Sequence, residues 1–321
     1  MEPIAIIYSD IHHALWNSYN HHYRRTKNGL KVEKIIKLKA KLLKVPILFC
    51  GDLIHKDKNM TNELIDQTLP TFNKRFSSGP DTYAISGNHD QGKENTLDQP
   101  SYSYINTFSK VFPKLHCIDN QSIQTRKFKI HGVPYLTHDI GLNKAIKMRI
   151  KELARGWPNI LLLHTNLPGA LDTDGREMET HLKKDIYKLL KAFDMVLVGH
   201  IHAPMKLAKN VYQIGAPNHQ RKTDRDMDLG YWTLYDTMEM IFTPIKMPKF
   251  VELEFGETAP DTKDFYYNKP PAKAETKSTT KHNFSEVNNR KRLAKNYLRE
   301  RHIKDHEKAE ALLKVIKDLD D

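Results

Sequence analysis

The sequence predicts an α/β fold built on a largely parallel sheet, and two observations support this prediction. Five short apolar runs each end in a polar residue, and segments with apolar positions at a helical period lie between them. Short apolar runs bounded by turn residues are typical of strands buried on both faces. Alternation of such strands with helices is the pattern of parallel α/β proteins.

The elements follow one another along the chain in a regular order. The five apolar runs predict strands over residues 4–8, 46–50, 82–85, 160–163 and 195–198. Helical periodicity predicts helices over 32–43, 64–76 and 186–193, the second of them kinked or split by Pro70. From residue 211 onward, strands are predicted over 211–216, 230–236, 240–245 and 251–255, without long helices between them. We expect these later strands to complete a second sheet of the same domain.

Length and composition bound the organisation of the chain. Its 321 residues allow about two domains, or one large domain with an extension. With 39% hydrophobic residues the chain can bury a core, which excludes wholesale disorder. We predict a folded domain over residues 1–255, a linker over 256–284 that is rich in Pro, Lys, Thr and Ser, and a charged helical tail over 285–321.

Charge and segment composition restrict the surroundings of the protein. Lys and Arg exceed Asp and Glu by 51 − 39 = 12, which favours an anionic partner. No stretch approaches the ~20 apolar residues of a membrane span, and the first residues do not resemble a secretory signal. Only Cys50 and Cys117 are present, so we expect reduced thiols, a cytoplasmic location and no membrane partner.

Polar residues that can bind metals follow all five of the first predicted strands. Polar groups at the carboxyl ends of parallel strands gather in one crevice. Carboxylate, imidazole and amide groups are the ligands of paired Mn²⁺, Fe or Zn²⁺ ions, which can clamp both oxygens of a displacement at phosphorus. Asp52 stands where a bridging carboxylate is needed. The motifs are Asp10-x-His12, Gly51-Asp52-Leu53-Ile54-His55, Gly87-Asn88-His89-Asp90, His164-Thr165 and Gly199-His200-Ile201-His202.

Other histidines and the cysteine of the second strand are interpreted as structural. His13 neighbours a candidate ligand, but the D-x-H spacing selects His12. Cys50 precedes Asp52 in a buried strand and is expected to belong to the core.

These motifs, in this order over about residues 1–245, resemble those of the calcineurin-like metallophosphoesterases. The resemblance implies a two-sheet α/β sandwich flanked by helices, two divalent ions, most simply Mn²⁺ with Fe or Zn as alternatives, and no organic cofactor. It implies that one ion is held by Asp10, His12, Asp52 and His202, and the other by Asp52, Asn88, His164 and His200. It further implies that His89 faces the phosphate as an acid or electrostatic stabiliser, with Asp90 holding its ring.

Within that superfamily, His55 discriminates between members. Many phosphoprotein phosphatases carry GDxxDRG and GNHE, whereas this chain reads GDLIH and GNHD. The latter pairing is similar to the SbcD-type recombination nucleases, in which the histidine of GDxxH supports DNA cleavage. The resemblance therefore implies a DNA exo- or endonuclease of a recombination and repair complex, in a bacterial or phage-infected cell. The alternatives are a phosphodiesterase or phosphatase for small molecules, RNA or phosphoproteins and, more remotely, a non-catalytic scaffold on the same fold.

Two basic segments are candidates for DNA contact. There is no room between residues 236 and 256 for the separate DNA-capping domain of longer members, so basic residues of the core are expected to replace it. An interleaved tyrosine and several cations suit phosphates and an unstacked base, although a charge run is also typical of a solvated face. The candidate residues are Arg24, Arg25, Lys27 and Lys56.

The predicted tail has a basic first half and an apolar stripe in its last turns. Amphipathic helices of this kind bind grooves of partner proteins. In the resembled family, helices after the nuclease domain dock on the coiled-coil root of an SbcC-type SMC-like ATPase, which implies a heterotetramer of two nuclease and two ATPase subunits. The alternatives are docking on the core of the same chain and a free basic helix that contacts nucleic acid. The expected partner-binding residues are Leu312, Leu313, Ile316 and Leu319.

Overall fold

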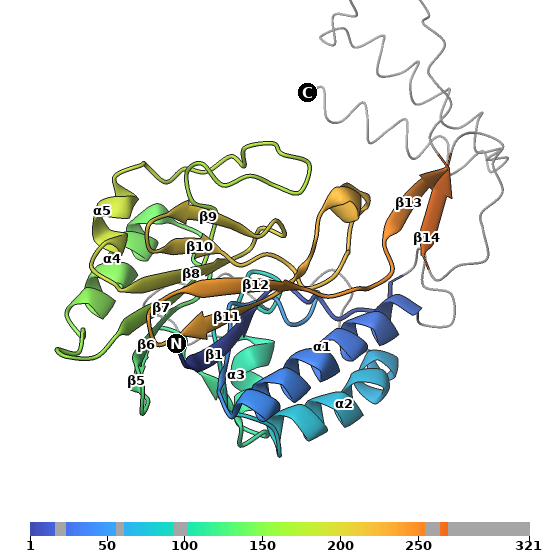
Figure 1. Cartoon of the computed structure of the whole chain (residues 1–321), viewed down its shortest axis with the longest axis horizontal. Helices are drawn as coiled ribbons and strands as arrows, with labels where there is room; N and C mark the ends of the chain where they lie inside the picture. The colour runs from blue at the N-terminus through green and yellow to red at the C-terminus, as the bar shows by residue number, and fades with distance from the viewer. Residues whose placement is uncertain (17–23, 56–60, 93–101, 254–263, 269–321) are drawn as a thin grey trace, which may run out of the picture. The chain divides into compact units, whose positions relative to one another are not determined.

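The computed structural model describes residues 1–16, 24–55, 61–92, 102–253 and 264–268. Their strands form two mixed six-stranded sheets and one small two-stranded sheet (Figure 1). The predicted tail and most of the predicted linker lie outside the described residues. Within the described ranges, no helix combines the length and the apolarity that crossing a membrane requires.

The first sheet has the strand order β12-β11-β1-β2-β3-β4. Strands β1 to β4 run parallel, and β11 and β12 extend the sheet with antiparallel pairs beside β1. The bounds are β1 Pro3–Tyr8, β2 Ile47–Phe49, β3 Thr82–Ala84, β4 Leu115–Cys117, β11 Gly230–Tyr235 and β12 Met240–Pro244.

The second sheet has the order β5-β6-β7-β8-β10-β9. Its four inner strands are parallel, and an antiparallel strand closes each edge. The bounds are β5 Ser122–Gln124, β6 Lys129–Val133, β7 Asn159–His164, β8 Met195–Gly199, β9 Met205–Ala208 and β10 Val211–Gln213. The small third sheet pairs β13 (Phe250–Leu253) in parallel with β14 (Phe265–Asn268).

Helices cover the outer face of each large sheet (Figure 1). The first sheet carries α1 (Arg24–Leu43), α2 (Asn62–Phe76) and α3 (Tyr104–Ser109). The second carries α4 (Asp139–Ile150) and α5 (Ile186–Leu190), and a 3₁₀ helix, η3, spans Lys222–Asp226. The arrangement of helices, sheet, sheet and helices confirms the predicted α/β two-sheet sandwich.

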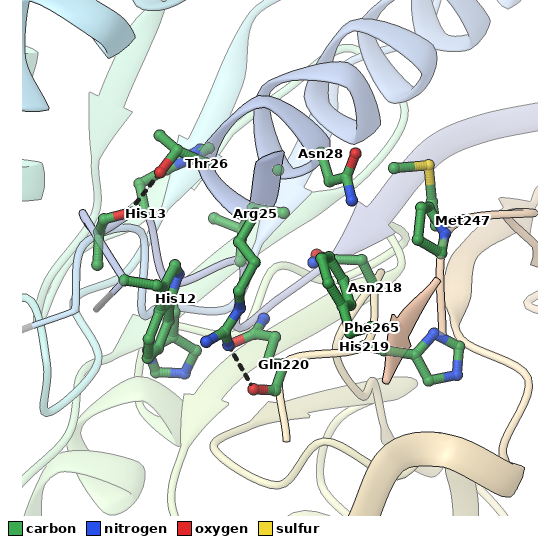
Figure 2. Close-up of a pocket in the computed structure, with 15 residues that line it drawn as sticks. His12, His13, Arg25, Thr26, Asn28, Asn218, His219, Gln220, Met247 and Phe265 are labelled. Atoms are coloured by element: carbon green, nitrogen blue, oxygen red, sulfur yellow. Dashed lines mark hydrogen bonds between the residues drawn. The ribbon is translucent and has the colours of Figure 1, made fainter. Parts of the chain in front are cut away.

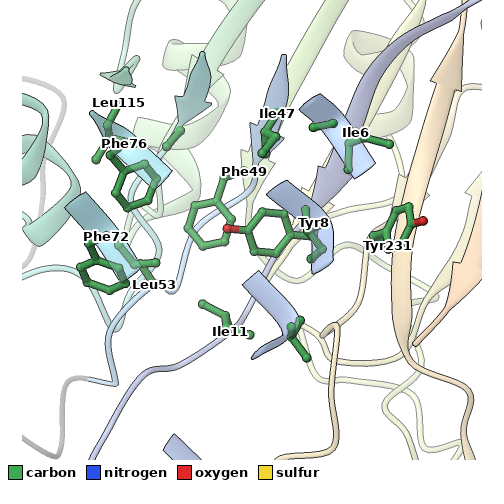
Figure 3. Packing of buried hydrophobic residues seen from close by; sticks show 14 of the residues in the cluster. Ile6, Tyr8, Ile11, Ile47, Phe49, Leu53, Phe72, Phe76, Leu115 and Tyr231 are labelled. Atoms are coloured by element: carbon green, nitrogen blue, oxygen red, sulfur yellow. The ribbon is translucent and has the colours of Figure 1, made fainter. Parts of the chain in front are cut away.

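The alternation of side chains along the strands builds three buried clusters. In β1, Ile6 and Tyr8 face the helices while Ile7 faces the second sheet. In β7, Leu162 joins the cluster between the sheets, whereas Leu161 packs towards α4 and α5. The helix-side cluster of the first sheet is rich in aromatic rings, among them Tyr8 and Phe49 with centroids 4.8 Å apart (Figure 3). Both faces of these strands are therefore buried, as continuous apolar runs predict.

Three predictions about the elements need correction. Of the late strands that were expected to complete the second sheet, only β10 does so, by pairing with β8. β11 pairs with β1 and β12 with β11, so both extend the first sheet, and β13 belongs to the small third sheet. α2 is one continuous helix: Pro70 lies on its exposed side with Asp66, so solvent can reach the Asp66 carbonyl that loses its N–H partner. The predicted linker contains a strand, β14, which pairs with β13.

Candidate dinuclear metal centre

The seven predicted ligands come from the carboxyl ends of strands in both large sheets. Asp10 and His12 follow β1, Asp52 follows β2, and Asn88 follows β3. His164 is the last residue of β7, and His200 and His202 follow β8. The structure brings all seven together in two groups.

The first group contains Asp10, His12 and His202, whose ligand atoms lie within 4.8 Å of one another. His12 Nε2 is 3.8 Å from Asp10 Oδ1 and 3.4 Å from His202 Nε2. It is also 3.5 Å from Asp52 Oδ2. Atoms bound to one ion at about 2.1 Å lie about 3–3.4 Å apart, so these side chains fit a common ion.

The second group contains Asp52, His164 and His200, which also converge within 4.8 Å. Asp52 Oδ2 is 3.4 Å from His164 Nε2. Asn88 Oδ1 completes the group, 3.2 Å from His164 Nε2 and 2.8 Å from His200 Nδ1. One oxygen of Asp52 therefore faces both groups, which is the geometry of a bridging carboxylate.

The backbone is strained at four of these positions. Asp10, His12, Asp52 and His200 have positive φ values of 54°, 48°, 62° and 98°. Non-glycine residues seldom adopt this region, and such strain concentrates at functional sites. The turns after β1, β2 and β8 therefore aim side chains into the crevice at an energetic cost that the surrounding packing must offset.

Two glycines permit this crowding. Gly51 has a φ of +99°, and a Cβ there would stand 2.5 Å from His164 Nδ1. A Cβ on Gly87 would stand 2.1 Å from Asp52 Oδ1. The glycines of the GD and GNHD motifs thus leave space for the ligands themselves.

A hydrogen bond orients the His164 ring from behind, and a buried carboxylate lies close behind the His202 ring. His164 Nδ1 lies 2.6 Å from the carbonyl oxygen of Cys50, which leaves Nε2 directed at Asp52. His202 Nδ1 lies 3.6 Å from Oδ2 of the fully buried Asp224. Partners of this type fix the tautomer and orientation of metal-binding histidines.

Asp224 is a site residue that sequence reasoning missed. Its carboxylate accepts the backbone N–H groups of Gln220 and Arg221 at 2.8 and 2.9 Å, and the Thr173 hydroxyl at 2.9 Å. These interactions join two loops to the ring of His202. No short motif marks Asp224, because its role depends on the return of a loop far from the other motifs.

The buried charges perturb one another strongly. Burial raises the pKa of Asp52, but His164 and His12 more than reverse this effect and hold it well below its usual range. Burial lowers the pKa of His164, yet the Asp52 and Asp10 carboxylates raise it to about 9. Burial and the neighbouring His164 lower the pKa of His200 to about 3. The buried Asp52 carboxylate is therefore balanced by a protonated His164 in the metal-free protein, and a cation can take the place of that proton.

His55 lies beside the metal ligand His12 and the ring of His89. Its ring stacks on His89 with centroids 4.5 Å apart and an interplanar angle of 16°. Its Nδ1 is 3.1 Å from His12 Nδ1. Trp16 covers it with a centroid distance of 4.7 Å, and the Arg25 guanidinium lies 4.0 Å from the Trp16 centroid. A continuous series of contacts therefore runs from Arg25 through Trp16 and His55 to His89, although the Trp16 and His55 rings are tilted by 41° to each other.

The predicted role of Asp90 is wrong. Its buried carboxylate does not hold the His89 ring, whose Nδ1 has no hydrogen-bond partner. It accepts instead the backbone N–H groups of Asp52, Leu53, Ile54 and Gly87 at 2.7–3.1 Å. Asp90 thus ties the turn after β2 to the turn after β3, while the His89 N–H donates to Asp52 Oδ1 at 2.9 Å.

The candidate DNA-contact residues have different environments. The prediction for Arg25 is wrong: its side chain is buried, and Nη2 donates to the Gln220 carbonyl at 2.6 Å (Figure 2). It contributes to a small polar hollow beside His12 rather than to an exposed surface. Arg24 is half-buried and Lys27 is exposed, while Lys56 lies outside the described residues.

A separate cleft opens on the metal ligands. It is lined by His12, Asp52, His89, Asp172, Met178, His200, Ile201 and Arg221. His89 lines this cleft, whereas His55 is not among the residues that line it.

The fold and this centre define a dinuclear metal hydrolase. Residues 5–204 match the family model described as calcineurin-like phosphoesterase, so the chain belongs to that family. It is a hydrolase of phosphoester bonds with candidate ligands for two metal ions. No curated protein matches the chain.

Two solved structures are similar in part. The protein TT1561 of Thermus thermophilus has 12% sequence identity and a TM-score of 0.47, over 77% of this chain and 100% of that one. A dimetal phosphatase from Danio rerio has 9% identity and a TM-score of 0.42, over 73% and 93% of the two chains.

Proposed function

We propose that the chain is a metal-dependent DNA phosphodiesterase of the SbcD type. The observation that supports this most is the position of His55. It occupies the last place of the GDxxH motif, stacks on His89 and contacts His12. Phosphatases with GDxxDRG have a carboxylate at that place, so an imidazole there gives the cleft a different set of donors.

In the proposed reaction, the metal ligands, His89 and His55 have different roles. When bound, two divalent ions lower the pKa of a water nucleophile and stabilise charge on the phosphoryl oxygens. His89 lines the cleft and donates a hydrogen bond or proton to the leaving 3′-oxygen. His12 uses Nε2 as a ligand atom, so its proton lies on Nδ1 and is donated to His55 Nδ1. His55 then carries its own proton on Nε2 and fixes the His89 ring by stacking.

One observation favours a phosphatase as the second candidate. Arg221 lines the same cleft, and a guanidinium group binds the dianion of a phosphomonoester well. The two functions are separated by turnover of linear DNA, bis-p-nitrophenyl phosphate and p-nitrophenyl phosphate, each with Mn²⁺ and with a chelator. We expect Mn²⁺-dependent cleavage of DNA and of the diester. Preferred hydrolysis of the monoester without DNA cleavage would establish the phosphatase instead, and Asp52→Asn purified in parallel controls for contaminants.

We also propose an SbcC-type ATPase as the partner. The support is the apolar stripe Leu312, Leu313, Ile316 and Leu319, which lies outside the described residues and rests on the sequence alone. Such a stripe is costly to expose and suits the groove at a coiled-coil root.

A further inference from the structure

The cleft over the metal ligands is asymmetric in charge and depth. The ligands that line its floor are buried, with exposed fractions of 3% for His12 and 1% for Asp52. The Arg221 side chain lines the same cleft but is 53% exposed, so its guanidinium lies further out, at the mouth. Among the described residues, it is the one lysine or arginine that lines this cleft.

Arg221 is held in place without being neutralised. Its backbone N–H donates to Asp224 Oδ2 at 2.9 Å, and the same oxygen lies 3.6 Å from His202 Nδ1. Its Nη1 is 3.8 Å from Asp172 Oδ2, a loose and partly solvated pair of the kind that contributes little. Asp172 is fixed in turn by the Thr173 N–H at 2.8 Å. The guanidinium can therefore exchange its contact with Asp172 for a stronger one with phosphate at little cost.

We propose that Arg221 forms a subsite for a second phosphate of a polynucleotide, next to the phosphodiester that lies over the metal ligands. The scissile phosphate is accommodated at the buried floor, and a chain leaving the floor passes Arg221 at the mouth. The proposal rests on the proposed function, since a substrate with a single phosphate has no group to place there. It assigns to Arg221 recognition of substrate length rather than chemistry.

The test compares Arg221→Gln with Arg176→Gln on two substrates. Arg176 belongs to the neighbouring loop, is 78% exposed, pairs with Asp174 and does not line the cleft. For Arg221→Gln we expect KM on a short single-stranded oligonucleotide to rise about tenfold, because a charge-assisted contact is lost. The ratio of oligonucleotide to bis-p-nitrophenyl phosphate turnover should fall by the same factor, with metal content retained. The slope of log K for oligonucleotide binding against log salt concentration should become shallower by about one unit, as expected for the loss of one phosphate contact.

The complementary experiment changes the substrate instead of the protein: a neutral methylphosphonate replaces the phosphate next to the scissile one. Wild type should lose about as much on this oligonucleotide as Arg221→Gln loses on the normal one, and the variant should lose little more. An Arg221→Gln enzyme that behaves like Arg176→Gln overturns the subsite while DNA cleavage by wild type stands. Equal losses on both substrates place Arg221 at the scissile phosphate and also overturn it. Absence of oligonucleotide cleavage by wild type refutes the proposed function itself.

Discussion

At the scale of single residues, substitution of His89 distinguishes a loss of catalytic rate from a loss of metal binding. Its ring lines the cleft and lies edge-on to the His12 ring with centroids 4.7 Å apart, and its backbone N–H donates to Asp52 Oδ1. We predict that His89→Ala retains metal but cleaves DNA about 10²–10⁴-fold more slowly, the usual contribution of a general acid. Metal analysis and single-turnover rates measure both quantities. Loss of metal from this variant would make His89 a ligand instead.

Metal binding should depend on pH through His164. The buried carboxylates raise its pKa to about 9, so the metal-free protein carries a proton on His164 at neutral pH. Nδ1 faces the Cys50 carbonyl, and the proton that must leave is therefore the one on Nε2. We predict that Mn²⁺ affinity rises about tenfold per pH unit from pH 6.5 to 8.5, with proton uptake by the buffer. Calorimetric titration with Mn²⁺ in buffers of different ionisation heat measures both the affinity and the number of protons released. An affinity that does not change with pH would contradict this account.

The identities of these residues could be predicted from sequence, but their couplings could not. The D-x-H, GD, GNHD and GHxH motifs are local, so Asp10, Asp52 and Asn88 were recognisable as candidates. Asp224 was not, because it meets His202 only through the fold of the loop after β10. The role of Asp90 was also misjudged, since adjacency to His89 in sequence does not bring their side chains together.

At the scale of elements, a buried ionic group fastens α1, α2 and β1 together. Glu33 of α1 pairs with Arg75 of α2 and accepts the Tyr8 hydroxyl at 2.9 Å, and its other oxygen lies 3.3 Å from His13 Nε2. Both Glu33 and Arg75 are buried. The group lies beside the turn that carries Asp10 and His12, which explains why His13 is structural rather than a ligand.

We predict that Glu33→Ala lowers the free energy of unfolding by about 3–5 kcal/mol, because it leaves the Arg75 charge buried and unpaired. Urea denaturation measures the change. Lys34→Ala, on the exposed side of the same helix, is the control and should change stability by less than about 0.5 kcal/mol. A change for Glu33→Ala as small as that of the control would show that Arg75 finds another partner or solvent.

Element type was predictable where the pattern is local, and pairing was not. The apolar runs of β1, β2, β7 and β8 identify buried strands, but nothing in β11 indicates that it pairs with β1 across more than 200 residues and brings β12 into the same sheet. The helix over α5 was predicted too long, and it ends at Leu190. β14 was missed although its three aromatic residues, Phe265, Tyr266 and Tyr267, favour a strand, because the Pro- and Lys-rich sequence around it was interpreted as a linker.

At the scale of the whole molecule, the activity and the partner should be separable. The folded unit spans Met1–Lys269, and the proposed ATPase-binding stripe lies beyond it. We predict that deletion of residues 285–321 preserves intrinsic Mn²⁺-dependent cleavage but abolishes co-purification with an SbcC-type ATPase and ATP-stimulated cleavage. Undiminished complex formation by the truncated chain would refute the docking proposal, and replacement of Leu312 and Ile316 by Asp in the full chain tests the stripe directly.

The two-sheet fold matters for function because it supplies the metal ligands from two directions. Asp10, His12, Asp52 and Asn88 follow strands of the first sheet, and His164, His200 and His202 follow strands of the second. Neither sheet holds a complete set, and Asp52 Oδ2 faces ligands from both. The account therefore depends on one buried carboxylate that serves two ions.

The most direct test is the metal content of wild type and Asp52→Ala after saturation with Mn²⁺ and removal of free metal. We predict two ions per chain in wild type and none in the variant, because the loss of a shared ligand weakens both sites. Asp174→Ala, which removes an exposed carboxylate outside the cleft, should keep both ions. Two ions bound to Asp52→Ala with near-native affinity, or a single ion in wild type, would contradict the assignment of Asp52 as the bridge of a dinuclear centre.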